Sequence, residues 1–327
     1  MRHVPTGLIV LFAGLLAGCQ AEQSALAPHG DQATEIAKLA WLLFAMAGAV
    51  LAIVLAAVAL ALHAPDRVRK RLAGSPAVIV GGIAFPVVVL TFLLVYGLSL
   101  TASESRGGTA DLRVEVTGEQ WWWRIAYPGQ NGESIRSANE IRVPVGANVE
   151  FVLKTADVIH AFWVPSLGGK VDMVPGRTNR LTLRAEREGI YRGQCAEYCG
   201  GPHAWMGLTV VAMPAADFAD WLEAEAATSL TPADDGAWAG RELFLGAGCG
   251  GCHTVRGTNA AGSIGPDLTH FGSRRSVGVD TLPLSPENIA RFIEDGQHIK
   301  PGNRMPPFRI FSGTELAQLS NYLAGLK

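Results

Sequence analysis

The chain of 327 residues is long enough for two or three domains. Its 27 basic residues nearly balance its 29 acidic residues, and no polybasic stretch with interleaved aromatic residues occurs, which excludes nucleic acid as an expected partner. Charged residues make up only 17% of the chain, and the apolar excess lies in the first hundred residues. This distribution indicates a membrane-anchored protein with a soluble remainder.

The N-terminus has the features of an export signal. Arg2 and His3 precede an apolar stretch from Leu8 to Leu16 that is too short to span a bilayer. Residues 1–18 are therefore predicted to be a signal peptide. The segment Leu16-Ala17-Gly18-Cys19 resembles a bacterial lipobox, in which the cysteine is acylated and becomes the mature N-terminus. The alternative is an ordinary signal peptide that happens to contain a cysteine.

Two longer apolar segments follow, at about 39–62 and 77–100, and each can cross about 30 Å of hydrocarbon. They predict a transmembrane helical hairpin over residues 35–104. The loop between them contains Arg67, Arg69, Lys70 and Arg71, which places it on the cytoplasmic side under the positive-inside rule. The sequence thus predicts a bacterial inner-membrane protein with two spans, contact with membrane lipid and its soluble part on the periplasmic side.

The periodicity of the apolar residues changes to two after the second apolar segment. Short alternating runs recur through residues 110–222, separated by turns rich in glycine and proline. Many short strands punctuated in this way are typical of an antiparallel sandwich or barrel. The apolar positions of these runs are Leu112, Val114 and Val116, then Val149, Phe151 and Leu153, then Leu181 and Leu183, and finally Leu208 and Val210.

One loop of this predicted β domain carries four metal-binding side chains in close succession. Cys195, Cys199, His203 and Met206 follow the pattern C-x3-C-x3-H-x2-M. Thiolate, imidazole and thioether ligands suit copper, and the second thiolate allows two copper ions bridged by both sulfurs. Such a centre needs a second imidazole. The other histidine of the domain is His160, whose aromatic and apolar neighbours suit a buried ligand.

Three other interpretations of this loop compete. A disulfide between Cys195 and Cys199 is typical of exported proteins but leaves His203 and Met206 without a role. A structural zinc site rarely includes methionine and prefers C-x2-C spacing. A copper chaperone with a C-x3-C motif would need a thioredoxin-like βαβ pattern, which this sequence lacks. The spacing of the four ligands favours copper.

Four segments together resemble subunit II of the haem–copper cytochrome c oxidases, over about residues 35–222. They are the metal loop, Asp157-Val158-Ile159-His160, Gly118-Glu119-Gln120-Trp121-Trp122-Trp123 and Asp172-Met173-Val174-Pro175-Gly176-Arg177. The resemblance implies an all-β cupredoxin-like Greek-key sandwich that holds a binuclear CuA centre. It makes Cys195 and Cys199 the bridging ligands. His160 and His203 become terminal nitrogen ligands, and Met206 and the backbone oxygen of Glu197 weak axial ligands.

The same resemblance implies two further roles. The Glu197 carboxylate would reach a magnesium ion at the interface with the catalytic subunit, and Trp121 would be the surface aromatic through which electrons arrive. Packing is the alternative for the three tryptophans at 121–123, since at least one residue of an alternating run should lie in the core. The sequence departs from the family at 74–79, which lack the usual carboxylate. The resemblance therefore does not extend to proton uptake through that residue.

A second cofactor motif follows a segment at 223–236 that is rich in Ala, Thr, Asp and Pro and is predicted to be a linker. Cys249-Gly250-Gly251-Cys252-His253 is a C-x-x-C-H motif, which is typical of covalent attachment of a c-type haem with the histidine as an axial ligand. A redox pair or half of a zinc site is the alternative for C-x-x-C alone.

The rest of residues 237–327 supports the haem interpretation. Met305 is the only methionine after the linker and is the predicted second axial ligand, with His270 and His298 as competitors. The run Gly265-Pro266-Asp267-Leu268-Thr269 and a closing helix at 313–326 resemble small class I cytochromes c. A small all-α cytochrome c domain is therefore expected.

Taken together, these features predict a multidomain subunit through which electrons enter a cytochrome c oxidase, a proton-translocating oxidoreductase that is active only within its complex. The expected partners are catalytic subunit I, subunit III, and a cytochrome c or an upstream cytochrome complex as electron donor. Two alternatives remain: a CuA-containing small subunit of a nitric oxide reductase, and a membrane-tethered electron carrier or copper-delivery protein. A quinol oxidase subunit is disfavoured because those relatives lose the copper ligands.

Overall fold

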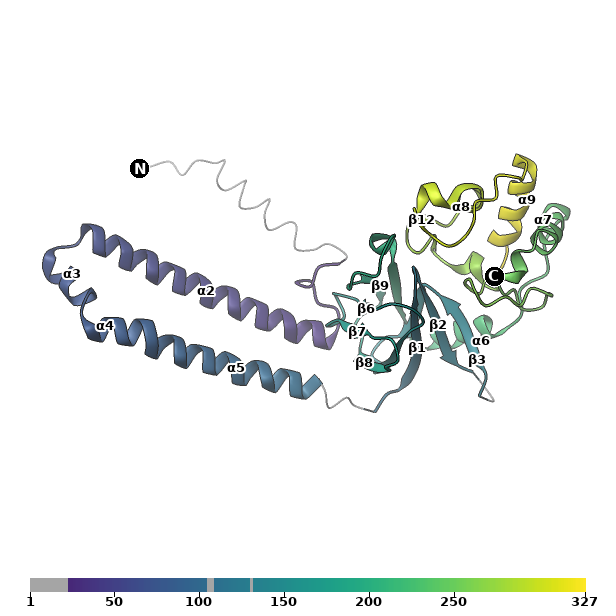
Figure 1. The fold of residues 1–327 in the computed structure, drawn as a ribbon. Coiled ribbons are helices and arrows are strands. Elements are labelled where there is room, and N and C mark those ends of the chain that lie inside the picture. Colours follow the sequence, from purple (N-terminus) through teal and green to yellow (C-terminus); the bar gives the residue numbers. More distant parts are fainter. Residues whose placement is uncertain (1–22, 105–108, 130–131) are drawn as a thin grey trace, which may run out of the picture. The chain divides into compact units, whose positions relative to one another are not determined.

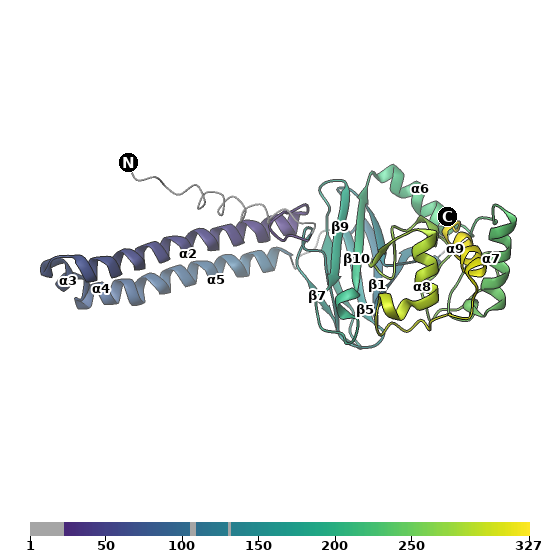
Figure 2. The same ribbon diagram turned by 90° about the horizontal axis from the view of Figure 1, so that it is seen from above.

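The N-terminal part of the computed structural model is a helical hairpin. The structure describes residues 23–104, 109–129 and 132–327, so the predicted signal peptide and Cys19 lie outside it. The hairpin turns at its two short helices (Figures 1 and 2). Among the described residues, two helical stretches, Asp31–His63 and Ser75–Ala102, are long and apolar enough to cross a membrane. The elements are α2 (Asp31–His63), α3 (Asp66–Leu72), α4 (Ser75–Ile79), the π-helical turn η2 (Val80–Ala84) and α5 (Phe85–Glu104).

The second helical stretch widens into η2 immediately before Pro86. Proline lacks a backbone N–H and its ring clashes with the preceding turn, and a π-turn is a local adjustment that accommodates such a residue. Gly81 and Gly82 lie within this turn. A membrane helix tolerates proline and glycine where local π adjustments satisfy the freed backbone groups, and the backbone here shows such an adjustment.

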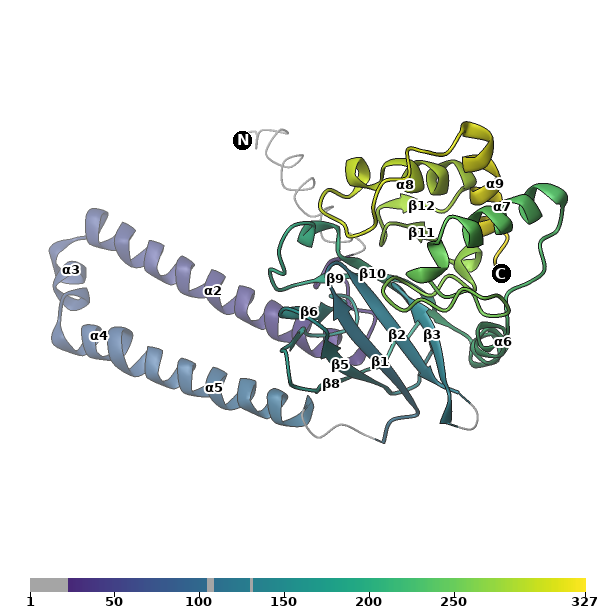
Figure 3. The ribbon, with the colours of Figure 1, turned by 45° about the vertical axis from the view of Figure 1, so that its right-hand side comes forward.

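The described part of residues 109–226 forms a cupredoxin-like sandwich of two five-stranded sheets, with strand orders β3-β2-β1-β5-β8 and β4-β10-β9-β6-β7 (Figure 3). The strands are β1 (Leu112–Glu119), β2 (Trp122–Pro128), β3 (Ser134–Ala138), β4 (Glu140–Pro144), β5 (Val149–Thr155), β6 (His160–Trp163), β7 (Val171–Met173), β8 (Asn179–Leu183), β9 (Gly189–Cys195) and β10 (Gly207–Met213). Helix α6 (Ala215–Ala226) follows them.

The alternating runs predicted from the sequence are strands whose apolar side chains fill this sandwich. Val114 and Val116 of β1 and Leu153 of β5 are completely buried, and the partner runs in β8 and β10 face the same core. The sandwich is not antiparallel throughout, however, because β1 pairs in parallel with β5 and β4 pairs in parallel with β10. Periodicity identifies which residues face inward but carries no information about strand direction.

The chain passes from one sheet of the sandwich to the other at Asn139. Asn139 separates β3 from β4 and has a φ of 67°, a conformation that asparagine adopts more readily than most residues. Its side-chain oxygen accepts a hydrogen bond from the Trp123 backbone N–H at 2.9 Å, and its own N–H donates to the Trp123 carbonyl at 3.0 Å. These two bonds fix the corner beside the most deeply buried tryptophan.

The C-terminal part is a small, mainly helical cytochrome c domain with its own core. Its elements are α7 (Asp235–Gly246), the 3-10 turns η5 (Cys249–Gly251) and η6 (Phe271–Ser273), the short strands β11 (Ser276–Val277) and β12 (Leu282–Pro283), α8 (Pro286–Ile299) and α9 (Gly313–Ala324). The predicted closing helix begins as expected, with a capping box between Ser312 and Glu315, and ends at Ala324. Its apolar face, which includes Leu319 and Leu323, packs into this core.

Candidate copper and haem sites

Two buried thiols form the centre of the first site. Cys195 ends β9 and Cys199 lies in the loop that follows, and their Sγ atoms are 3.8 Å apart. A disulfide requires about 2.05 Å. Both cysteines are free in the structure, and less than a twentieth of each is exposed. The geometry therefore fits a pair of thiolate ligands rather than the disulfide considered from the sequence.

Each of the two predicted histidines lies next to one of the two thiols. His160, on β6, is completely buried and its Nδ1 atom is 3.7 Å from the Cys195 Sγ. His203 lies in the 3-10 turn η4 (His203–Trp205), and its Nδ1 atom is 3.4 Å from the Cys199 Sγ. Each sulfur thus has one imidazole nitrogen as a neighbour. The fold brings His160 to the loop because β6 pairs with β9, so Phe162 faces Cys195 across the ladder.

The two remaining donors complete the set. The Met206 Sδ atom is 3.8 Å from the Cys199 Sγ, and the Glu197 carbonyl oxygen is 3.2 Å from the Cys195 Sγ. The loop is closed by a backbone hydrogen bond from Cys195 to the Met206 carbonyl at 2.9 Å. Soft sulfur atoms and imidazole nitrogens are ligands that suit copper. The residues present therefore fit the metal that the sequence predicts.

The hydrogen bond between the two thiols separates their acidities. It lowers the pKa of Cys195, although burial of the sulfur opposes this, and it raises the pKa of Cys199. One thiolate next to one thiol is the arrangement expected of two close sulfurs that would repel each other if both were ionised. A bound cation would favour ionisation of both.

A carboxylate behind His160 fixes the orientation of that ring. Asp157 Oδ1 lies 2.8 Å from Nε2 of His160, which leaves Nδ1 facing the sulfurs. Burial opposes protonation of His160, but its hydrogen bonds with Cys195 and Asp157 outweigh this and raise its pKa. The Gln120 backbone N–H also donates to the other oxygen of Asp157 at 2.7 Å. Carboxylates in this position orient metal-binding histidines in many proteins.

The Glu197 side chain is partly exposed and lies next to a lysine. Its carboxylate is 44% exposed and lies 3.7 Å from the ammonium group of Lys170, which also lies 3.8 Å from Asp172. Its backbone oxygen and its carboxylate therefore face different surroundings, as the two roles expected of this residue require.

Trp121 contacts the metal loop directly. Its Nε1 atom donates to the Cys199 carbonyl at 3.1 Å, and the Gln120 side chain donates to the same oxygen at 2.9 Å. Trp121 lies in the turn between β1 and β2 and is half-buried, whereas Trp123 is completely buried, as the packing interpretation requires of at least one of the three. The sequence marked Trp121 but gave no role to Gln120.

The second site is built around the C-x-x-C-H motif. Nδ1 of His253 lies 2.8 Å from the Pro266 carbonyl, which can only accept, so Nδ1 carries the proton and Nε2 is left as the electron-pair donor. Burial lowers the pKa of His253 and favours the neutral ring that binds metals. Gly265 packs so closely on this ring that a Cβ there would lie 2.6 Å from Cε1.

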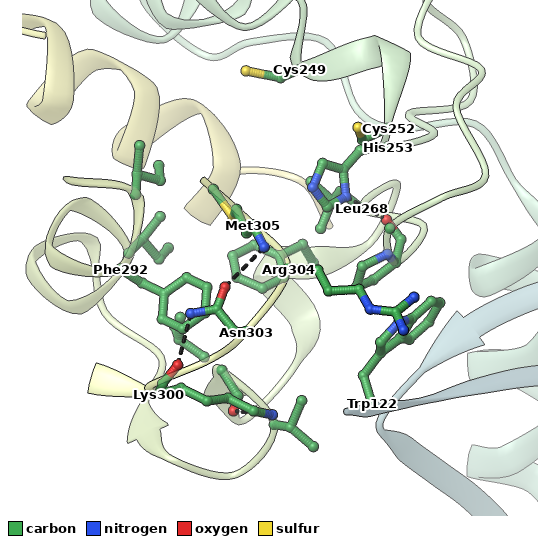
Figure 4. Close-up of a pocket in the computed structure, with 18 of the residues that line it drawn as sticks. Trp122, Cys249, Cys252, His253, Leu268, Phe292, Lys300, Asn303, Arg304 and Met305 are labelled. Atoms are coloured by element: carbon green, nitrogen blue, oxygen red, sulfur yellow. Dashed lines mark hydrogen bonds between the residues drawn. The ribbon is translucent and has the colours of Figure 1, made fainter. Parts of the chain in front are cut away.

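His253 and Met305 project into one cavity that Cys249 and Cys252 also line (Figure 4). Its other walls are mostly apolar, including Leu268 and Phe292, which suits a haem. His270 and His298, the competitors for the second axial position, are not among its described lining residues. The first is buried against the Ala227 carbonyl and the second is exposed. The arrangement therefore fits a haem between His253 and Met305.

Comparison with known proteins finds a family model for each of the two soluble domains. The model of the cytochrome c oxidase subunit II periplasmic domain matches residues 131–213, and the cytochrome c model matches residues 237–327. Cytochrome c oxidase subunit 2 of Alkalihalophilus pseudofirmus is 33% identical over 341 residues, which cover all of this chain and 97% of the relative. The subunit 2 of Bacillus subtilis is 32% identical over 80% of this chain and 78% of its own length.

Among solved structures, the periplasmic domain of subunit II of cytochrome oxidase (CoxB) of Bradyrhizobium japonicum is 36% identical. The matched region covers 36% of this chain and 95% of the CoxB domain, with a TM-score of 0.34. The family assignment depends on the sequence relatives, which extend over both soluble domains and the helical hairpin. Since a third of its residues are identical to those of an oxidase subunit 2 along nearly the whole of both proteins, the chain belongs to the cytochrome c oxidase subunit 2 family.

Proposed function

We propose that the chain is the subunit through which electrons enter a cytochrome c oxidase, with a binuclear copper centre in the metal loop and one covalent haem c in the cytochrome domain. The observation that carries this proposal is the convergence of four further donors on the two cysteine sulfurs. Four side-chain and backbone donors, from His160, His203, Met206 and Glu197, lie 3.2 to 3.8 Å from a Cys195 or Cys199 Sγ.

Residues around the two predicted sites hold the ligand side chains in fixed orientations. When bound, a thiolate-bridged copper pair and a haem with His and Met ligands provide one-electron transfer. The chain's contribution is to hold the ligands in place before the metals arrive: Asp157 orients His160, the Pro266 carbonyl orients His253, and the Asn303 side chain accepts a hydrogen bond from the Met305 backbone at 2.9 Å. Preorganised ligands keep one geometry in both oxidation states.

Several finer assignments belong to the same proposal. The partner is a haem–copper catalytic subunit I that reduces oxygen to water, with subunit III beside it, and the donor is a cytochrome c or a cytochrome complex. Trp121 is the residue through which electrons reach the copper loop, and Glu197 offers its exposed carboxylate to magnesium at the subunit interface. The helical hairpin lies in the bacterial inner membrane, and Cys19 carries a lipid.

The test is the cofactor content of the full-length chain purified from membranes. We expect two coppers with an EPR signal shared by both ions, and one haem that remains attached under denaturing conditions. Two matched variants separate the sites: Cys199→Ser should lose the copper signal and keep the haem, and Cys252→Ser should weaken covalent haem attachment and keep the copper. One copper or none in the wild type, with Cys195 and Cys199 joined as a disulfide, would contradict the proposal.

Co-purification distinguishes the remaining functions. An oxidase subunit should be isolated with a large haem-bearing partner and support oxygen consumption. A nitric oxide reductase subunit would support reduction of nitric oxide instead, and a tethered carrier or copper-delivery protein would be isolated alone. Each of these last two results would replace the oxidase assignment.

A further inference from the structure

A buried lysine joins the cytochrome domain to the β sandwich. Lys300 follows α8 and only 2% of it is exposed. Its ammonium group donates to the Trp121 carbonyl at 2.7 Å and lies 3.4 Å from the Gly278 carbonyl. A buried ammonium group is unfavourable unless hydrogen bonds replace its water. Here one acceptor belongs to the β sandwich and the other to the cytochrome domain, so the lysine is satisfied by both.

The segment that begins at Gly278 is the second element of this contact. Gly278, Val279 and Asp280 all have positive φ, at 69°, 66° and 60°. A β-branched residue such as valine rarely adopts this conformation, and it persists only where the surroundings hold it. Val279 is 8% exposed and belongs to the apolar cluster of the β sandwich rather than to the core of its own domain. The unusual backbone therefore places one apolar side chain of the cytochrome domain against the other domain.

Two polar contacts flank the segment. Asp280 Oδ2 lies 2.7 Å from Nε of Arg192, on the strand that ends at Cys195. On the other side of Lys300, the Arg304 guanidinium donates to the Gln120 side chain at 2.7 Å. Arg304 lies beside Trp122 and immediately precedes Met305 (Figure 4). The Arg304 contact thus reaches the turn at 120–122, whose residues line the haem cavity, and the Asp280 contact reaches β9.

We propose that Gly278–Asp280 and Lys300 form a latch that holds the cytochrome domain on the turn at 120–122. The latch replaces movement on a flexible linker by one fixed placement, with the haem cavity next to Trp121. Segment 227–234 alone could extend by roughly 25 Å and would allow many other placements. The significance for electron transfer depends on the proposed function, whereas the docking itself does not.

The test separates docking from cofactor chemistry. A protease-recognition sequence is inserted between Thr231 and Pro232 of the full-length chain, which is purified in detergent with any bound subunits and then cleaved. Gel filtration measures how fast the cytochrome fragment leaves the membrane-anchored fragment, and protein staining detects it with or without cofactors. Other contacts between the two domains set the background rate, including those of Arg142 with the Ser273 carbonyl, of the Arg275 N–H with Glu140, and of Arg256 with the Glu225 and Ala227 carbonyls. Copper and haem contents are measured on the same samples.

We expect Lys300→Met and Arg192→Glu each to accelerate release at least tenfold. Asp280→Arg should do the same alone, and combining Arg192→Glu with Asp280→Arg should restore the rate to within threefold of wild type. Arg113→Glu is the matched control, because it reverses an arginine charge whose partner, Glu150, lies in the same domain. Release at the wild-type rate in all three single variants, with copper and haem intact, would contradict the latch and leave the proposed function unaffected. A wild type that lacks copper or haem would count against the proposed function instead.

Discussion

Asp157 Oδ1 and His160 Nε2 lie 2.8 Å apart, and this pairing leaves the other nitrogen of the imidazole 3.7 Å from the Cys195 sulfur. The carboxylate thus decides which nitrogen faces the metal loop. The same carboxylate group receives the Gln120 backbone N–H and lies 3.8 Å from Arg304 of the cytochrome domain. One side chain therefore contacts a predicted copper ligand, the turn that carries Trp121 and the second domain.

Replacing Asp157 with alanine should weaken copper binding about 10- to 100-fold, the usual effect of removing such a partner from a metal-binding histidine. The physical reason is that His160 loses the acceptor that fixes its ring. Competition with a copper chelator measures the change. Glu115→Gln, which alters an exposed carboxylate paired with Lys154, is the control and should bind copper as wild type does. Equal affinity in both variants would remove Asp157 from the site.

Gly265→Ala should disturb the haem site without touching a ligand. The added Cβ would lie 2.6 Å from the His253 ring, so ring or loop must move, at a cost of about 1–3 kcal/mol in stability. Optical spectra should show a larger high-spin fraction while the haem stays covalently bound. Gly313→Ala is the control within the same domain, because a Cβ there meets nothing within 4 Å. An unchanged spectrum and melting temperature in Gly265→Ala would contradict the placement of His253.

Met305→Leu should lower the haem reduction potential by on the order of 100 mV, part of the ~0.8 V range that axial ligands control. Leucine keeps the apolar volume and removes the sulfur. A redox titration followed in the haem absorption bands measures this. His270→Ala and His298→Ala should leave the potential close to that of the wild type. A large change in either histidine variant, with none in Met305→Leu, would transfer the axial role to that histidine.

Because of Lys300, the free energy of unfolding should rise as the pH increases above neutrality. Burial lowers the pKa of Lys300 from 10.5 to about 7, against a smaller opposing effect of Cys199. Between these two pH values the unfolded chain binds more protons at this site than the folded chain. The destabilising contribution of Lys300 to the free energy of unfolding therefore decreases as the pH rises from about 7 to 10.5. The penalty is fully present below pH 7, and its upper bound is about 5 kcal/mol at about 1.4 kcal/mol per pKa unit.

Lys300→Met removes this titration and isolates it. The stability of the wild type relative to Lys300→Met should rise between pH 7 and 10, and thermal unfolding of the two proteins at several pH values measures the difference. Other titrating groups are common to both proteins and cancel. Parallel stability curves across this range would show that Lys300 keeps an ordinary pKa in the folded protein and is not desolvated there.

The local sequence by itself predicted which residues could carry the chemistry. Cys195, Cys199, His203 and Met206 lie within twelve residues, and Cys249, Cys252 and His253 within five, so spacing alone identified both motifs before any contact was known. The core-facing strand residues and the closing helix follow from periodicity, because burial on one face repeats every two residues in a strand and every 3.6 in a helix.

Tertiary structure decided everything that depends on contacts distant in sequence. No local pattern indicates that β1 and β5 run in parallel, or that Asp157 lies behind a ligand ring. Nor does one show that Lys300 reaches the carbonyl of a residue 179 positions earlier. A lysine near a helix end is usually solvated, and a valine between a glycine and an aspartate usually lies in an exposed turn. Both are buried here because a second domain supplies an acceptor for the lysine and an apolar surface for the valine, and the residues nearby in sequence do not encode that surface.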